Sequence, residues 1–163
     1  MPSESVSSCA GLYTSGQLSE KIAPSPSGSQ LLENAAINRT KLKIENNVKI
    51  FDQYVPNEEV GKYYTACDVV VLPYISATNS GIVQTAFGFN KPVIVTNAGG
   101  LPDVVIDDVT GYIVPTENSK AIAKAVIKFY NNRDKINFEE NIEKDKKRFE
   151  WDRLVELIES FMI

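Results

Sequence analysis

From residue 47 onward, short apolar runs alternate with stretches in which apolar residues recur every three or four positions. The first pattern is typical of strands buried in a parallel sheet, and the second is typical of amphipathic helices. The predicted strands cover residues 48–51, 68–73, 92–96 and 112–114. Strands that alternate with helices at this spacing predict an α/β fold, with a Rossmann-like, mostly parallel sheet and flanking helices.

The predicted helices fill the segments between and after these strands. Asn57 can cap a helix that begins with two acids, and Gly99 and Gly100 form a turn into a short helix. The other helices are expected over residues 30–43, 57–67, 81–89, 117–129 and 151–162. The charged run 139–148 is predicted to be a solvated helix face or a loop.

The first thirty residues differ from the rest because they are rich in serine and proline and show no apolar periodicity. Such a composition buries too little apolar surface to offset the entropy lost on ordering. We therefore predict a flexible Ser/Pro-rich leader over residues 1–29. Residues 30–163 are predicted to form one Rossmann-like domain that ends in a C-terminal helix.

Composition removes several classes of function. The chain of 163 residues contains no histidine, which excludes serine–histidine triads, cysteine–histidine dyads and histidine zinc sites. A net charge of -4 argues against a nucleic-acid-binding surface, which would need a basic stripe. No apolar run is long enough to cross a bilayer, and no secretion signal is visible, so the cytoplasm is the expected location.

The loop that follows the predicted strand 68–73 offers the clearest chemistry. Ser76, Thr78, Asn79 and Ser80 supply hydroxyl and amide groups, and Gly81 opens a helix. A helix start has unpaired backbone N–H groups and partial positive charge, which together favour a phosphate group. The pattern indicates a phosphorylated ligand such as a nucleotide. The alternative is an ordinary strand-to-helix loop whose serine and asparagine side chains cap the helix.

From about Asn47 to the C-terminus, the chain resembles the nucleotide-sugar-binding half of the family 4 (group 1) glycosyltransferases of the GT-B fold. The resemblance rests on five pieces in the family's order: NVKIFDQYVPNEEVGKYYTACDVVVLPY, the Ser80-Gly81 helix start, KPVIVTNAGGLPDVV, TGYIVPTEN and FEWDRLVELIE. It implies an enzyme that transfers a sugar from a nucleotide-sugar donor to an acceptor.

The resemblance also implies site residues. The donor phosphates would meet the start of the helix, and the donor sugar and ribose would lie against that helix and the glycine turn. The implied phosphate-binding residues are Thr78, Asn79, Ser80 and Gly81; the sugar or ribose residues are Gln84, Gly99 and Gly100; and the base pocket is Tyr54 and Val55. No catalytic residue is assigned. The nucleotide-sugar would be a substrate, and no metal or other cofactor is expected.

The chain departs from the family pattern at two points. Two glutamates that the family carries eight residues apart fall here on Ala77 and Thr85, so we expect Gln84 to take one of their hydrogen-bonding roles. The strand–helix–strand that opens this domain in the family is also missing, and the leader resembles none of it. We therefore expect strand 48–51 to pair directly with strand 68–73, or an edge to stay unpaired.

These observations predict a glycosyltransferase, or its donor-binding part, in an incomplete GT-B C-terminal domain. The expected partners are a nucleotide-sugar donor, a glycan or lipid-linked acceptor and a separate acceptor-domain chain. Peripheral attachment to a membrane would occur through such a partner. Nucleic acid is not an expected partner. The alternatives are a non-catalytic module that binds a nucleotide or a partner, a truncated inactive remnant, and an epimerase of the same fold.

Overall fold

The structure is a computed structural model that describes residues 37–51, 55–77, 81–147, 155 and 158–161, together with the backbone of residues 9–12. The chain divides into two compact units. One consists of residues 1–13 and 58–163, and the other of residues 14–57. The predicted boundary between residues 29 and 30 lies outside the described ranges and stays a prediction.

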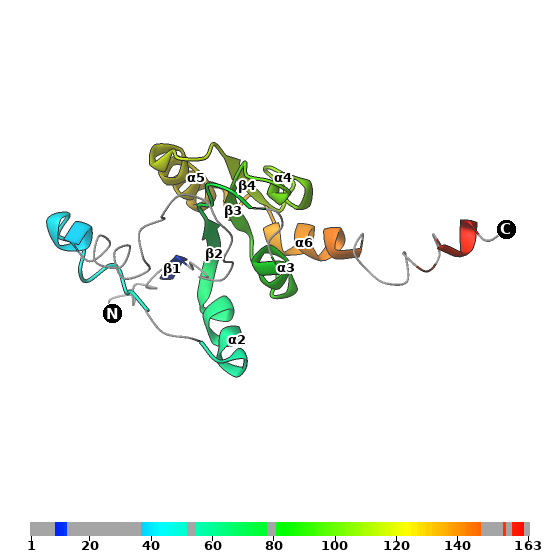
Figure 1. Cartoon of the computed structure of the whole chain (residues 1–163), viewed down its shortest axis with the longest axis horizontal. Coiled ribbons are helices and arrows are strands. Elements are labelled where there is room, and N and C mark those ends of the chain that lie inside the picture. Colours follow the sequence, from blue (N-terminus) through cyan, green and yellow to red (C-terminus); the bar gives the residue numbers. More distant parts are fainter. Residues whose placement is uncertain are drawn as a thin grey trace, which may run out of the picture. The chain divides into compact units, whose positions relative to one another are not determined.

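A parallel sheet forms the centre of the larger unit (Figure 1). Its strands lie in the order of the sequence: β1 (Cys9–Leu12), β2 (Cys67–Leu72), β3 (Val93–Thr96) and β4 (Gly111–Val114). All neighbouring pairs are parallel. Every residue of β3 is buried, as its unbroken apolar pattern predicts. The sheet confirms the predicted α/β class and the predicted strands 68–73, 92–96 and 112–114.

Helices cover both faces of this sheet (Figure 1). They are α2 (Asn57–Ala66), α3 (Gly81–Gly88), α4 (Leu101–Val104), α5 (Ser119–Asn132) and α6 (Phe138–Lys146). Side chains alternate along β2, so Val70 and Leu72 join α3, α4 and Ile142 of α6 in one core cluster. Val69 and Val71 join α5 and Phe138 in the other. Helices α3 and α4 share a face because both connections step along the sheet in one direction.

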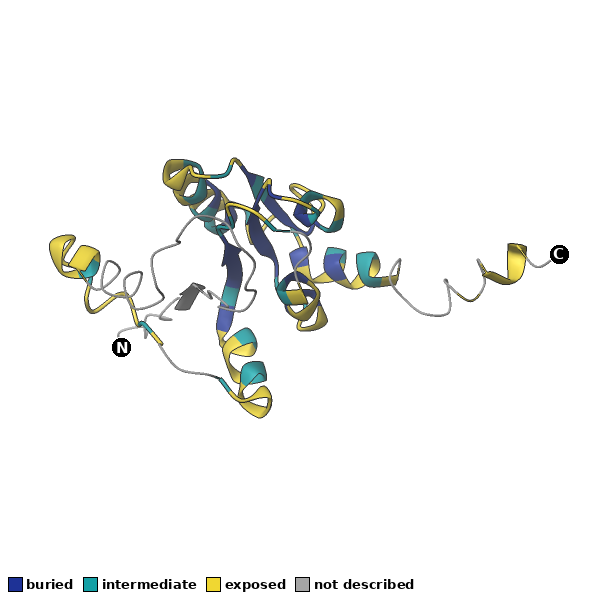
Figure 2. Cartoon of the chain, in the orientation of Figure 1, coloured by how far each residue is buried: buried dark blue, intermediate teal, exposed yellow. Residues whose placement is uncertain are grey.

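Burial decreases from the strands outward to the helices (Figure 2). Helix α2 has no buried residue. It packs through the Tyr64 ring, which stacks on the Phe89 ring at a centroid distance of 5.3 Å. Helix α5 has a stronger anchor in the buried residues Ala125 and Phe129. The side chain of Asn118 caps α5 by accepting a hydrogen bond from the backbone N–H of Ala121 at 3.0 Å.

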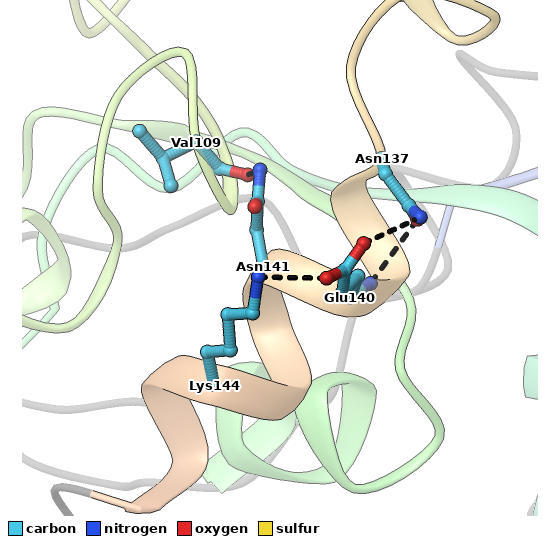
Figure 3. A network of polar contacts seen from close by, with 5 residues as sticks. All are labelled: Val109, Asn137, Glu140, Asn141 and Lys144. Carbon is cyan, nitrogen blue, oxygen red and sulfur yellow. Dashed lines mark hydrogen bonds and ion pairs between the residues drawn. The ribbon is translucent and has the colours of Figure 1, made fainter.

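Residues 139–146 of the charged run predicted as a solvated helix face or a loop belong to helix α6, whose charged side chains are mostly exposed while Phe138 and Ile142 are buried. Figure 3 shows its first turn, where the Asn137 side chain accepts a bond from the Glu140 N–H and donates one to the Glu140 carboxylate. A hydrogen bond from Lys144 lowers the pKa of Glu140. Asn141 donates to the Val109 carbonyl at 3.2 Å, which ties α6 to the loop before β4.

Two predictions about the first part of the chain are wrong. Residues 48–51 do not form a strand, and the Val48 carbonyl accepts a hydrogen bond from the Arg39 guanidinium instead of from a neighbouring strand. Strand β1 (Cys9–Leu12) lies within the predicted leader 1–29, whose extent stays a prediction. Strand β1 pairs with β2, so neither the predicted pairing of 48–51 with 68–73 nor an unpaired β2 edge is found.

Two helix predictions differ in their bounds, and a third falls on residues that are only partly described. Cys67 opens β2 rather than closing α2, and its thiol donates to the Tyr64 carbonyl. Residues 37–41 are helical within the predicted span 30–43, whose beginning lies outside the described residues. Near the C-terminus, residues 155 and 158–161 are helical and exposed, and the remainder of the predicted helix 151–162 is not described.

Candidate functional site

The loops that leave β2, β3 and β4 lie at one edge of the sheet, because the carboxyl ends of parallel strands point the same way. Residues 73–77 follow β2, residues 97–100 follow β3, and residues 115–118 follow β4. Open α/β sheets bind their ligands at this edge. The structure therefore brings residues 73–77 and the glycine turn at Gly99 and Gly100 to the same edge of the sheet, after neighbouring strands.

A buried hydroxyl connects two of these loops. Thr96 is 2% exposed, and its Oγ1 donates to the Tyr74 carbonyl at 2.5 Å. The Leu72 carbonyl lies 3.5 Å from the same oxygen. The last strand residue of β3 thus contacts the backbone of the chain as it leaves β2.

The turn after β3 has the backbone geometry that its glycines predict. Gly99 has a φ of 52°, a left-handed conformation that glycine adopts without strain. Gly100 precedes α4 with no side-chain cap, while Asp103 in the first turn complements the helix dipole. The backbone N–H of Asn97 donates to the Val114 carbonyl at 2.7 Å, which joins this turn to the end of β4.

The start of α3 is open. Gly81 is exposed, and a Cβ atom added there would meet no atom within 4 Å. The first turn contains no acidic residue, so no carboxylate of its own neutralises the partial positive charge. The Thr85 hydroxyl donates back to the Gly81 carbonyl at 2.9 Å. The buried positions Val83, Ala86 and Phe87 fix the helix against the sheet.

The predicted site residues fall into three groups. Gly81, Gln84, Gly99 and Gly100 belong to the carboxyl-edge loops and to the helix that begins there, and Gln84 is exposed on α3. Thr78, Asn79, Ser80 and Tyr54 lie outside the described residues. Val55 is half-buried in the smaller unit, so its place in a base pocket stays a prediction. Thr96 is not among the predicted site residues, although the sequence shows a polar residue at the end of an otherwise apolar strand at this position.

The two positions where the family carries glutamates also belong to this region. Ala77 is half-buried and packs against the core, and Thr85 is exposed with its hydroxyl bonded within the helix. Glu117, in the loop after β4, is exposed and has a φ of 54°, which is uncommon for a residue other than glycine. The shifted pKa values among the described residues belong to Lys128, Glu140 and Glu143, away from these loops.

A hollow of about 440 Å³ lies at the opposite edge of the sheet, where Asp68 is the second residue of β2 and Pro92 precedes β3. Asp68 accepts a hydrogen bond from the Tyr130 hydroxyl at 3.1 Å. Within the described ranges, no group of potential ligands could hold a metal ion, and no helix has the length and apolar character to span a membrane. The metal-free site and the cytoplasmic location stay predictions.

The family model of the glycosyl transferases group 1 matches residues 28–149 of the 163. The chain belongs to the group 1 glycosyltransferases. A curated relative, the D-inositol 3-phosphate glycosyltransferase of Mycobacteroides abscessus, is 31% identical over 108 residues, which make up 64% of this chain and 24% of the relative. The chain spans about a quarter of the length of the curated relatives that it matches.

Solved structures agree on the fold. The C-terminal domain of a group 1 family glycosyltransferase from Francisella tularensis superposes with a TM-score of 0.68 at 18% identity, covering 76% of this chain and 64% of that one. The Anabaena protein HepE, solved in complex with UDP-glucose, gives 0.69 at 19% identity, covering 84% of this chain and 38% of HepE. The chain thus has the fold of the C-terminal domain of a group 1 glycosyltransferase.

Proposed function

We propose that the carboxyl-edge loops of this glycosyltransferase chain bind a nucleotide-sugar donor for transfer of its sugar to an acceptor. The observation that carries the proposal is the open start of α3, which has no acid of its own. Membership in the group 1 glycosyltransferases and the fold shared with HepE, solved with UDP-glucose, support the same site.

The donor diphosphate would lie against the start of α3, with Thr78, Asn79, Ser80 and Gly81 as its partners. A helix start contributes only about 0.3–1 kcal/mol per charge at an exposed position. Further contacts are therefore needed, and we assign the sugar and ribose to the segment of α3 at Gln84 and to the turn at Gly99 and Gly100. Tyr54 and Val55 are assigned to the base.

In the transfer itself, the bond between the sugar carbon and the diphosphate oxygen breaks, an acceptor hydroxyl oxygen forms the new glycosidic bond, and the hydroxyl proton passes to the leaving diphosphate. Backbone N–H groups at the start of α3 would stabilise the negative charge that develops on the leaving diphosphate, because their dipoles already point at it. This proposal requires no metal. The acceptor, a glycan or a lipid-linked molecule, and an acceptor domain on a separate chain belong to the proposal, as does a role in glycan biosynthesis.

Thermal unfolding of the purified chain, with and without millimolar UDP, GDP or ADP, tests donor binding. A ligand at a hundredfold its dissociation constant stabilises the folded state by about 2.7 kcal/mol, which a melting curve resolves. We expect one of the three nucleotides to raise the melting temperature. A cooperative transition that none of them moves would overturn the proposal for this chain.

A variant that adds a negative charge at the start of α3 tests where the nucleotide binds. Gly81→Glu places a carboxylate where the added side chain meets open space and where an acid suits the helix dipole, so the fold should stay intact. The same carboxylate would repel a diphosphate, and we expect the nucleotide-induced shift to disappear. Ala123→Glu adds the same charge at an exposed position of α5 and should keep the shift. An unchanged shift in Gly81→Glu would remove the start of α3 from the site.

A further inference from the structure

We propose that Thr96 is a positioning residue for the donor site: its hydroxyl holds the Tyr74 carbonyl and thereby fixes residues 74–77, the segment that leads from β2 toward α3. The consequence for nucleotide affinity rests on the proposed function. The hydrogen bond itself is short, at 2.5 Å, and its donor side chain is 2% exposed.

The position of Thr96 follows from where the β2–β3 ladder ends. The last paired residues are Leu72 and Val95. Strand β2 ends at Leu72, and Pro73 and Tyr74 follow it outside the paired region. The Thr96 side chain takes over at this point and donates to the Tyr74 carbonyl. A side-chain hydrogen bond thus continues the connection between the two chain segments beyond the last paired residues.

Packing alone holds this segment only at its ends. Tyr74 and Ala77 are half-buried and contact the core cluster of α3 and α4, whereas Ile75 is 70% exposed and Ser76 is exposed. A segment with so few buried contacts depends on its hydrogen bonds for a defined path. The Thr96 hydroxyl therefore connects the rigid end of β3 to the backbone that precedes the phosphate-binding helix.

The test compares three variants of the full chain. Thr96→Val keeps the shape of the side chain and removes the hydroxyl, while Thr96→Ser keeps the hydroxyl and removes a methyl group. Thr110→Val is the matched control, because Thr110 is also fully buried and its Oγ1 accepts from the Ile106 N–H at 2.9 Å, at the opposite edge of the sheet. The two valine variants leave a buried backbone partner without its hydrogen bond, and Thr96→Ser leaves a small cavity, so all three should melt below the wild type.

Only Thr96→Val should change the site. We expect its UDP affinity, measured by calorimetry with GDP and ADP in parallel, to fall about tenfold, or ~1.4 kcal/mol. Thr96→Ser and Thr110→Val should bind as the wild type does, within about twofold. Backbone NMR order parameters of Ile75 and Ser76 should fall in Thr96→Val alone, which reports on the segment independently of any ligand.

The two readouts separate the two proposals. If no nucleotide binds the wild type, donor binding by this chain fails, while the order parameters still decide the role of Thr96. If Thr96→Val binds like the wild type, or if Thr110→Val loses affinity to the same degree, Thr96 does not position the site. Equal order parameters at residues 75 and 76 in the wild type and Thr96→Val would likewise overturn the inference.

Discussion

Gly111 begins β4 at a point where the backbone of β3 leaves no room for a side chain. A Cβ atom there would lie 2.0 Å from the Val93 carbonyl oxygen, so the two strands would have to separate. We expect Gly111→Ala to lower the free energy of unfolding by about 3 kcal/mol or more. Urea denaturation measures this, with Gly88→Ala as the control because an added Cβ at Gly88 meets nothing within 4 Å. Equal midpoints for the two variants would show that the strands adjust.

At the residue scale, the sequence was sufficient to predict which residues are buried. It was not sufficient to predict which residues lie against a backbone carbonyl group of a neighbouring segment. Val69 and Val71 belong to a continuous apolar run, and a run of that kind implies burial without knowledge of neighbours. The roles of Thr96 and Gly111 depend on a carbonyl of an adjacent strand, Tyr74 in one case and Val93 in the other. Such a role appears only when the register is known, because the partners are about twenty residues away in the sequence.

At the scale of elements, α6 depends on the cap at its first turn. Asn137 accepts from the Glu140 N–H at 3.2 Å and donates to the Glu140 carboxylate at 3.0 Å. We expect Asn137→Ala to lower the free energy of unfolding by about 1 kcal/mol. The control is Asn131→Ala, at an exposed position of α5 away from its N-terminus, which should change it by less than about 0.5 kcal/mol in denaturant titrations. A loss no larger than that of the control would mean that packing alone holds α6.

One element was left open between helix and loop, and another was mispredicted. In α6 the buried residues Phe138 and Ile142 are separated by charged neighbours, so one apolar residue per turn was too weak a signal to predict a packed helix. Residues 48–51 show an apolar pattern that suits a strand, but a strand also needs a partner to hydrogen-bond with. Strand β1 pairs with β2 instead, and the Val48 carbonyl is satisfied by Arg39. Local pattern cannot reveal such competition between distant segments.

For the whole molecule, the alternation of strands and helices was sufficient to predict a parallel sheet with the β2 and β3 loops at one edge, where the candidate site lies. It could not predict the ends of the sheet, because edges are defined by which segments fail to pair. In the described part of the chain, β4 is the last strand on its side. Its outer edge would offer backbone groups to another chain unless they were covered.

The loop before β4 covers this edge with its own polar groups. The Asp107 carboxylate accepts a hydrogen bond from the Ile113 N–H at 3.0 Å, and the Asp108 N–H donates to the Gly111 carbonyl at 2.9 Å. Asp108 has a φ of 62° and pairs with Lys128 at 2.5 Å, which holds the loop in place. We therefore expect Asp107→Ala to uncover the Ile113 N–H and to increase self-association through β4, observed as a concentration-dependent rise in sedimentation coefficient.

Charge and hydrogen bonding make separable contributions to this protection, and two further variants distinguish them. Asp107→Asn removes the charge and keeps an oxygen that can accept from the Ile113 N–H, so it should sediment as the wild type does. Asp108→Asn removes a neighbouring charge, keeps the backbone donor to Gly111 and tolerates the left-handed conformation. If both asparagine variants associate as strongly as Asp107→Ala, repulsion between acidic loops keeps the edges apart. If only Asp107→Ala associates, the single hydrogen bond to Ile113 closes the edge.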